Sequence, residues 1–288
     1  MEWKAIAQAT WFGLVSGVNY ALFATGLTLV FGIMRVLNFA HGQVFMGGAI
    51  VAYVLMTFLG MDFFLAAAIA IVSVAAFGFA LNRIAVQPLI ARSSQAVLLS
   101  TIGISMMLLH GVLATLGPTG HFVETIFTGI TYIGGLSVST EGIVLFGIGS
   151  ATIAAVHLFL RRAKIGKDMQ ATIQNPVGAS LCGINTRRTY DYSLIMASAL
   201  AALGGILMAV LYSVNPFMGT SMLMKGFVIV IVAGMGNLVG ATILGVAIGV
   251  AESLFGVLVS AYFRETFIYG IMVVVLLLRP QGLFARRE

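Results

Sequence analysis

AIAQATWFGLVSGVNYALFATGLTLVFGIM, residues 5–34, runs for thirty consecutive positions without a charged residue. About 20 apolar residues are enough to cross the hydrocarbon core of a bilayer, so this stretch predicts a membrane span. It is too long for the core of a signal peptide and lacks a small-residue cleavage site after it, so we expect it to be retained. Uncharged runs also cover residues 63–82, 142–160 and 192–224, which predicts several spans.

The composition agrees with these runs. The chain is 60% hydrophobic and 8% charged, with a mean hydropathy of +1.08. Soluble domains carry about 25% charged residues, so we expect an integral membrane protein in contact with the lipid bilayer. Long continuous apolar runs, in place of alternating ten-residue segments, indicate helices and exclude a β-barrel. The predicted fold is an all-α, polytopic helix bundle.

Charged residues orient the bundle. The net charge of +6 does not indicate nucleic-acid binding, because the cations flank apolar runs as the positive-inside rule describes. We therefore place on the cytoplasmic side Arg83, Arg92, the loop 161–188, Arg279, Arg286 and Arg287. We place on the outer side Asp62, Glu124, Glu141, Asn215, Pro216 and Lys225, with Lys225 as a solvated lysine at a helix start.

Alternation of these loops predicts about nine spans, with eight or ten also possible, and an external N-terminus. The whole chain, 1–288, is then a single transmembrane domain. The predicted spans are 5–34, 36–59, 63–83, 95–116, 141–160, 191–213, 216–234, 238–258 and 263–279.

Two breaks interrupt this pattern, at residues 35–38 and 234–237, and a glycine-rich apolar segment follows each. Discontinuous helices of this kind direct helix ends at substrates near the midplane of transporters. Two independent tight turns explain the breaks equally well. At the first break, Asn38 either caps a turn or bonds freed backbone groups, and His41 either serves the path or packs at an interface.

A basic loop carries six of the fifteen Lys and Arg residues: Arg161, Arg162, Lys164, Lys167, Arg187 and Arg188. Within it, Asn175 suits an N-cap, Pro176 suits the first helical position and Gly183 suits the left-handed residue past the end. The loop therefore predicts a short capped helix, and a helix in a basic loop of a membrane protein indicates a docking surface.

Glu252 is an ionisable residue inside an apolar stretch. Such a residue is costly in a membrane and usually faces the bundle interior and a partner. It either lines the transport path or belongs to a structural pair. Glycines at four-residue spacing, Gly13 with Gly17 and Gly245 with Gly249, predict closely packed helices.

Signals of catalysis are weak. No segment matches a P-loop, since Gly166-Lys167-Asp168 lacks both the first glycine and the hydroxyl. The four histidines are not spaced as metal ligands, and Cys182, the single cysteine, excludes an intrachain disulfide. We expect neither an enzyme nor a metal site, and no cofactor bound by this chain.

Several motifs occur in an order and spacing that resemble the permease subunits of branched-chain amino acid ABC transporters. The resemblance covers nearly the whole chain. The motifs are RVLNFAHG (35–42), QNP (174–176) with LCGIN (181–185), GMGNLVGA (234–241), AESL (251–254) and RPQGLF (279–284).

The resemblance implies a multi-pass permease domain, residues 1–288, in the bacterial cytoplasmic (inner) membrane. It implies an importer for branched-chain or related amino acids, driven by ATP hydrolysed in two cytoplasmic ATP-binding subunits. Further implied partners are a second homologous permease, identical or different, and a periplasmic or other extracytoplasmic substrate-binding protein.

The resemblance also implies site residues. Residues 161–190 become a cytoplasmic coupling loop that contacts an ATPase through Asn175, Pro176, Val177, Ala179, Leu181, Gly183, Arg187 and Arg188. The loop departs from the family pattern at Gly178 and Ser180, where helix formers are common. Candidates for the translocation path are Asn38, Phe39, His41, Gly42, Gly236, Asn237 and Glu252.

Two alternatives remain open at this point. The family also includes permeases for urea, amides and small organic acids. A self-contained secondary transporter or channel would instead use Glu252 and His41 to carry protons.

Overall fold

The computed structural model describes residues 2–90, 92–123, 127, 129–133 and 136–284. Glu124, Arg286 and Arg287, which entered the predicted orientation, lie outside the described residues. The elements in chain order are α1 (Glu2–Met34), α2 (His41–Leu59), α3 (Phe63–Leu81), the π-helical turn η1 (Asn82–Val86), α4 (Gln87–Ile90), α5 (Ser94–Leu116), β1 (Ile130–Ile133), β2 (Leu136–Ser139), α6 (Thr140–Arg162), α7 (Lys164–Gln174), α8 (Pro176–Leu181), α9 (Thr186–Leu211), α10 (Met218–Ala233), α11 (Leu238–Leu258) and α12 (Arg264–Leu278).

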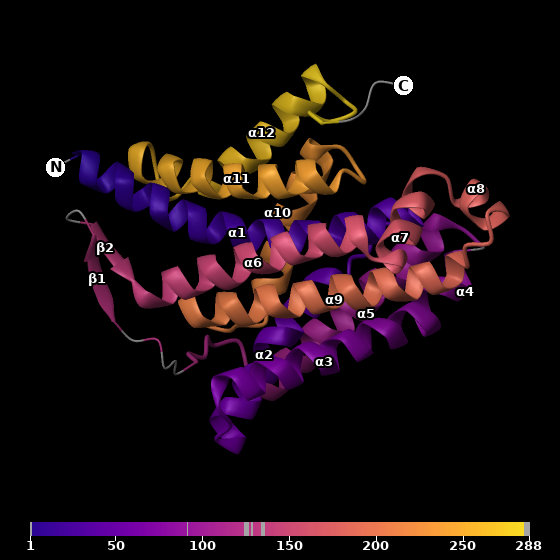
Figure 1. The fold of residues 1–288 in the computed structure, drawn as a ribbon. Helices are drawn as coiled ribbons and strands as arrows, with labels where there is room; N and C mark the ends of the chain where they lie inside the picture. The colour runs from indigo at the N-terminus through magenta and orange to yellow at the C-terminus, as the bar shows by residue number, and fades with distance from the viewer. Residues whose placement is uncertain (1, 91, 124–126, 128, 134–135, 285–288) are drawn as a thin grey trace.

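The helices form the predicted all-α membrane bundle around α1. In Figure 1, α1, α6, α9 and α11 run side by side, and α1 contacts each of the other three. The most apolar window of α1 is 83% buried, whereas that of α5 is 11% buried. Helix α1 is therefore a core element, and α5 is peripheral and apolar enough to face lipid.

Among the described residues, seven helices are long and apolar enough to cross a membrane: α1, α2, α3 continued through η1 and α4, α5, α6, α9 and α11. Two of the nine predicted spans correspond to shorter helices, α10 with 16 residues and α12 with 15. The structure confirms a polytopic helical protein, and the count of nine stays a prediction.

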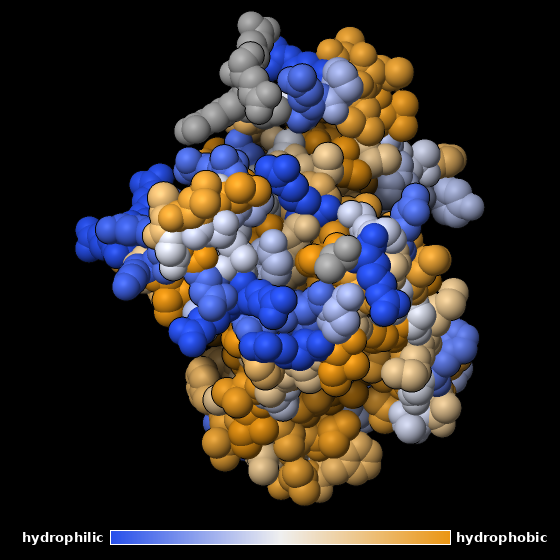
Figure 2. Space-filling model, turned by 90° about the vertical axis from the view of Figure 1, so that its right-hand side faces the viewer, coloured by the Kyte–Doolittle hydropathy of each residue, from blue (hydrophilic) through white to orange (hydrophobic). Residues whose placement is uncertain are grey.

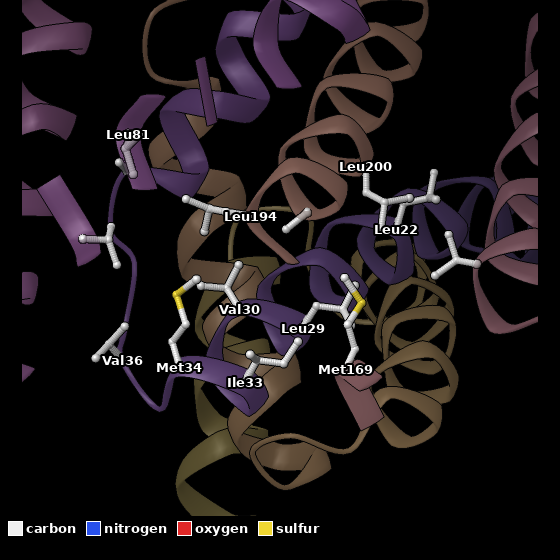
Figure 3. Packing of buried hydrophobic residues seen from close by; sticks show 14 of the residues in the cluster. Leu22, Leu29, Val30, Ile33, Met34, Val36, Leu81, Met169, Leu194 and Leu200 are labelled. Carbon is white, nitrogen blue, oxygen red and sulfur yellow. The ribbon is translucent and has the colours of Figure 1, made fainter. Parts of the chain in front are cut away.

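The connection between α1 and α2 corrects the predicted start of the second span. Arg35 takes a left-handed conformation, with φ of 54°, and the next residues are not helical. Val36, Asn38 and Ala40 are nevertheless buried, and Figure 3 shows Val36 on the chain that turns back after Met34. Span 36–59 therefore begins only at His41, after a buried non-helical segment, which membranes tolerate where protein surrounds it.

A short β-hairpin was not predicted. Strands β1 and β2 pair antiparallel, with Ile130 opposite Ser139 and Ile133 opposite Leu136. Gln8 of α1 donates a hydrogen bond through Nε2 to the carbonyl of Ser137 at 2.6 Å. The hairpin lies beside the N-terminal end of α1 in Figure 1.

Polar loops gather at the opposite end of the bundle. Helices α7 and α8 lie there, and Figure 2, which faces this end, shows hydrophilic side chains across much of it. All six Lys and Arg residues of the basic loop are exposed. This clustering agrees with the predicted cytoplasmic face.

Glycines bring α1 and α11 into backbone contact, as their spacing predicts. A methyl group added to Gly249 would collide with the Cα of Gly17, and one added to Gly245 would collide with the backbone of Ala21. Side chains reinforce the seam, because Ser253 Oγ donates to the Ala9 carbonyl at 2.6 Å. Close packing of small residues is the main source of helix association in lipid.

We expect Gly249→Val to lower the free energy of unfolding by about 1–3 kcal/mol, because overpacking separates the two backbones. Gly103→Val in α5 is the matched control, since a Cβ there meets no atom within 4 Å. Thermal unfolding of the purified variants in detergent measures the difference. Equal midpoints for the two variants would contradict the seam.

Candidate functional site

The predicted capped helix in the basic loop is present as α8. Asn175 Oδ1 accepts a hydrogen bond from the Gly178 amide at 2.9 Å, Pro176 occupies the first turn, and Gly183 is left-handed with φ of 83°. A Cβ at Gly178 would lie 3.2 Å from the side-chain nitrogen Nδ2 of Asn175, so a larger residue there would crowd the capping side chain. The predicted limits of this helix are confirmed.

Helix α8 presents an apolar surface at the polar end of the protein. Val177 is 67% exposed and Leu181 is 84% exposed, while Ala179 between them is buried. Residues four apart share one face of a helix, so the two exposed side chains form a pair. Arg187 and Arg188, in the first turn of α9, are exposed as well.

Helix α7, which sequence reasoning missed, joins α8 to the bundle. Met169 is fully buried, and Gly166 lies so close to Leu160 that any side chain would collide with the α6 backbone. Ile173 and Gln174 line a cavity of about 570 Å³ together with the 234–237 break and the tail residues Gln281 and Phe284. The short polar sequence of α7 carries no span signal, although its buried residues recur at helical spacing.

The 234–237 break holds the C-terminal segment against α10. Asn237 Oδ1 caps α11 by accepting from the Gly240 amide at 2.9 Å, and its Nδ2 donates to the Phe284 carbonyl at 2.7 Å. The amides of Leu283 and Phe284 bond the carbonyls of Val232 and Ala233. This break therefore lies beside the basic loop at the polar end of the bundle.

The first break lies deeper. Asn38 Oδ1 accepts from the Ala40 amide at 3.0 Å, which is the turn-capping role. His41, 1% exposed, packs on Phe23 with ring centroids 4.8 Å apart, and its Nε2 has no hydrogen-bond partner among the described residues. Phe39 packs on Phe227, and Gly42 allows α2 to approach the backbone of α10 at Gly219.

The third predicted position, Glu252, forms a buried charged cluster. Lys225 Nζ of α10 lies 2.7 Å from Glu252 Oε1 of α11, and Tyr20 of α1 donates to Glu252 Oε2 at 2.8 Å. Lys225 was expected as a solvated lysine at a helix start. That was wrong: it lies in the middle of α10, with its side chain 13% exposed.

The seven path candidates thus occupy three separate places: the deep connection at 38–42, the break at Gly236 and Asn237, and the Glu252 cluster. The structure does not bring them into one site. Sequence reasoning did not identify Lys225 and Tyr20 as the partners of Glu252. Lys225 could have been found, because it is a second charged residue surrounded by apolar sequence.

A second buried charge, Asp191, ties α9 to the end of α3. Its carboxylate accepts from Asn82 Nδ2 at 2.8 Å, Arg83 Nη2 at 2.6 Å and Gln87 Nε2 at 2.9 Å. The donors lie on η1 and α4, and π-helical turns often occur at functional sites. Asp191 follows Arg187 and Arg188, so this network links α3 to the start of α9 beside the basic loop.

Comparisons with known proteins agree with this architecture. The family model for the permease component of branched-chain amino acid transport systems matches residues 10–276. The fold and this match together define a membrane permease, and the chain belongs to this permease family. It is a transporter component and not an enzyme.

Curated relatives cover nearly the whole chain. The branched-chain amino acid permease LivH of Escherichia coli K12 is 32% identical over 98% of this chain and 96% of its own length. BraD of Pseudomonas aeruginosa is 31% identical over 96% of this chain and 94% of its own. A probable LivH of Methanocaldococcus jannaschii is 30% identical over 91% of this chain and 87% of its own.

A solved structure shares the fold. A chain of PsaBC from Streptococcus pneumoniae, in complex with Fab, superposes with a TM-score of 0.52 at 15% identity, over 96% of this chain and 91% of that one. At this identity the likeness concerns the fold alone.

We expect Asp191→Ala to lower the free energy of unfolding by about 1–3 kcal/mol, because the buried amide of Asn82 loses its acceptor. Arg83→Met should cost less, since the Arg83 side chain is 51% exposed. Thermal unfolding in detergent ranks the two variants. A larger loss for Arg83→Met would contradict this account.

Proposed function

We propose that this chain is the membrane-spanning permease subunit of an ABC importer that carries branched-chain or related amino acids into the bacterial cytoplasm. Two cytoplasmic ATP-binding subunits supply the energy, and ATP binds to them and not to this chain. A second permease subunit and an extracytoplasmic binding protein complete the assembly in the inner membrane. The exposed apolar pair on α8 is the observation that carries this proposal, together with the family.

Helix α8 is suited to dock in a groove of an ATPase. An exposed valine and leucine at a water-facing end gain free energy when a partner covers them, in proportion to the apolar area removed from water. The surrounding cations, among them Arg187 and Arg188, would orient a partner that carries complementary charge.

Two structural connections would transmit a movement of α8 to the transmembrane helices. Helix α7 connects it to the break between α10 and α11, through the cavity that Ile173 and Gly236 share. The start of α9 connects it to α3 through Asp191. An ATP-driven shift of α8 would therefore move helices that also carry Lys225 and Glu252 at a distance from the loop.

Replacing the apolar pair should uncouple transport. In proteoliposomes that contain all subunits, we expect Val177→Asp/Leu181→Asp to reduce ATP-dependent leucine uptake at least tenfold, because buried carboxylates oppose docking. The control variant Val177→Ile/Leu181→Met keeps the apolar surface and should transport normally. Uptake by this chain without ATPase subunits, driven by a proton gradient, would refute the importer.

Cys182 reports docking directly. It is the single cysteine of the chain, lies next to α8 and is exposed. We expect a maleimide to label it rapidly in the isolated chain and several-fold more slowly once the ATPase subunits bind, because the partner covers the thiol. Labelling at an unchanged rate in an assembled, active complex would place the ATPase contact elsewhere.

A further inference from the structure

The cluster of Tyr20, Lys225 and Glu252 lines a cavity that is separate from the basic loop and from the two breaks. The cavity has a volume of about 570 Å³, within the roughly 300–1,000 Å³ of small-molecule sites. Its walls come from residues 5–20 of α1, Lys225 in the middle of α10, the C-terminal parts of α9 and α11, and Arg264 at the start of α12. The cavity therefore extends from the middle of the bundle toward the end opposite α8.

A second, smaller cavity adjoins the first. It measures about 250 Å³ and shares with the larger one Tyr20, Met208, Tyr212 and Lys225. Its remaining walls include the apolar side chains of Phe45, Met218 and Met222. The charged cluster thus lies where the larger cavity meets a smaller and more apolar one.

The cluster has unused bonding capacity. An ammonium group has three donors, and Lys225 uses two of them, on Glu252 Oε1 at 2.7 Å and on Tyr20 Oη at 3.0 Å. The Glu252 carboxylate, with about four lone-pair positions, accepts from Lys225 and Tyr20. Lys225 and Glu252 can therefore each bind one further group of opposite charge while they remain bonded to one another.

The stability of the fold does not require an ion pair between Lys225 and Glu252. Well-packed apolar residues often replace a buried ion pair without loss of stability, and ionisable groups in membrane spans usually mark substrate pathways. The Lys225 side chain is 13% exposed and that of Glu252 is 10% exposed, so both remain in reach of the cavity.

We infer that this cluster binds the zwitterionic head of a free amino acid. The substrate ammonium bonds Glu252, the substrate carboxylate bonds Lys225 with support from Arg264, and an aliphatic side chain occupies the smaller cavity beside Met222. This inference rests on the proposed importer function and deepens it, because it places amino acid selectivity in the permease as well as in a binding protein.

The geometry also relates the site to the transport cycle. Lys225 lies on α10 and Glu252 on α11, and the break at 234–237 joins these two helices beside α7. A movement at that break would change the separation of the two charges. An amino acid bound to both would then be held in one arrangement of α10 and α11 and released in another.

Equilibrium binding tests the site. The full chain, assembled with its partner subunits in lipid nanodiscs and without the binding protein, is titrated with radiolabelled leucine in a scintillation proximity assay. We expect leucine to bind and to be displaced by valine, whereas isovalerate and isoamylamine, which each carry one of the two charges, compete at least tenfold more weakly. Isovalerate competing as well as valine would overturn the site.

The variant Lys225→Met/Glu252→Gln removes both charges and keeps side chains of similar size. We expect at least a tenfold loss of leucine affinity with subunit assembly unchanged. The matched control Lys4→Met/Asp62→Asn neutralises a lysine and a carboxylate outside the cavity and should bind leucine normally. If the double variant does not assemble, Tyr20→Phe, which removes one hydroxyl, should still weaken binding several-fold.

The binding assay separates the two proposals. Unchanged leucine affinity in Lys225→Met/Glu252→Gln, or no leucine binding to the wild-type complex, would overturn the zwitterion site while ATP-dependent uptake still supported the importer. Zwitterion binding that persists in a complex without ATP-dependent uptake would refute the importer and retain the site.

Discussion

Backbone contact between α1 and α11 is the constraint on which the rest of the bundle depends. Lipid tails are as apolar as leucine, so helices associate there through packing and not through the hydrophobic effect. Gly17 and Gly249 bring the two backbones together, and α1 is thereby held at the centre, where α9, α6 and α10 also pack on it. That contact also places Tyr20 of α1 within hydrogen-bond distance of Glu252 on α11.

Among the described residues, buried carboxylates occur in two clusters, one near the basic loop and one near the middle of the bundle. Asp191 receives three side-chain donors from η1 and α4, and Lys225 pairs with Glu252 across α10 and α11. The first cluster gives the Asp191 carboxylate three side-chain donors and joins η1, α4 and α9, which suits a rigid connection. The second faces a cavity and retains bonding capacity, which suits exchange with a ligand. These surroundings suit the Asp191 cluster to positioning helices and the Lys225–Glu252 cluster to binding a ligand.

Some features followed from local sequence because their physics is local. Asn175, Pro176 and Gly183 defined α8 correctly, since capping depends on neighbours within a few residues. The break at 35–38 was predicted, but its burial and its extension to His41 were not, and the hairpin of β1 and β2 was not predicted at all, because burial of the first and pairing of the second depend on distant parts of the chain. Lys225 was misplaced for the same reason: its partner lies 27 residues away and Tyr20 lies 205 away.

The sequence by itself determined that this chain is a polytopic helical membrane protein, because the length and charge-free character of its apolar runs leave few other ways to satisfy the backbone. It also determined the position of the capped loop helix and the family. The tertiary structure alone decided which helices meet through their glycines, that Glu252 faces Lys225 and Tyr20, and that this cluster lines a cavity. Those outcomes depend on the packing of residues far apart in the chain, and no local pattern encodes which faces will meet.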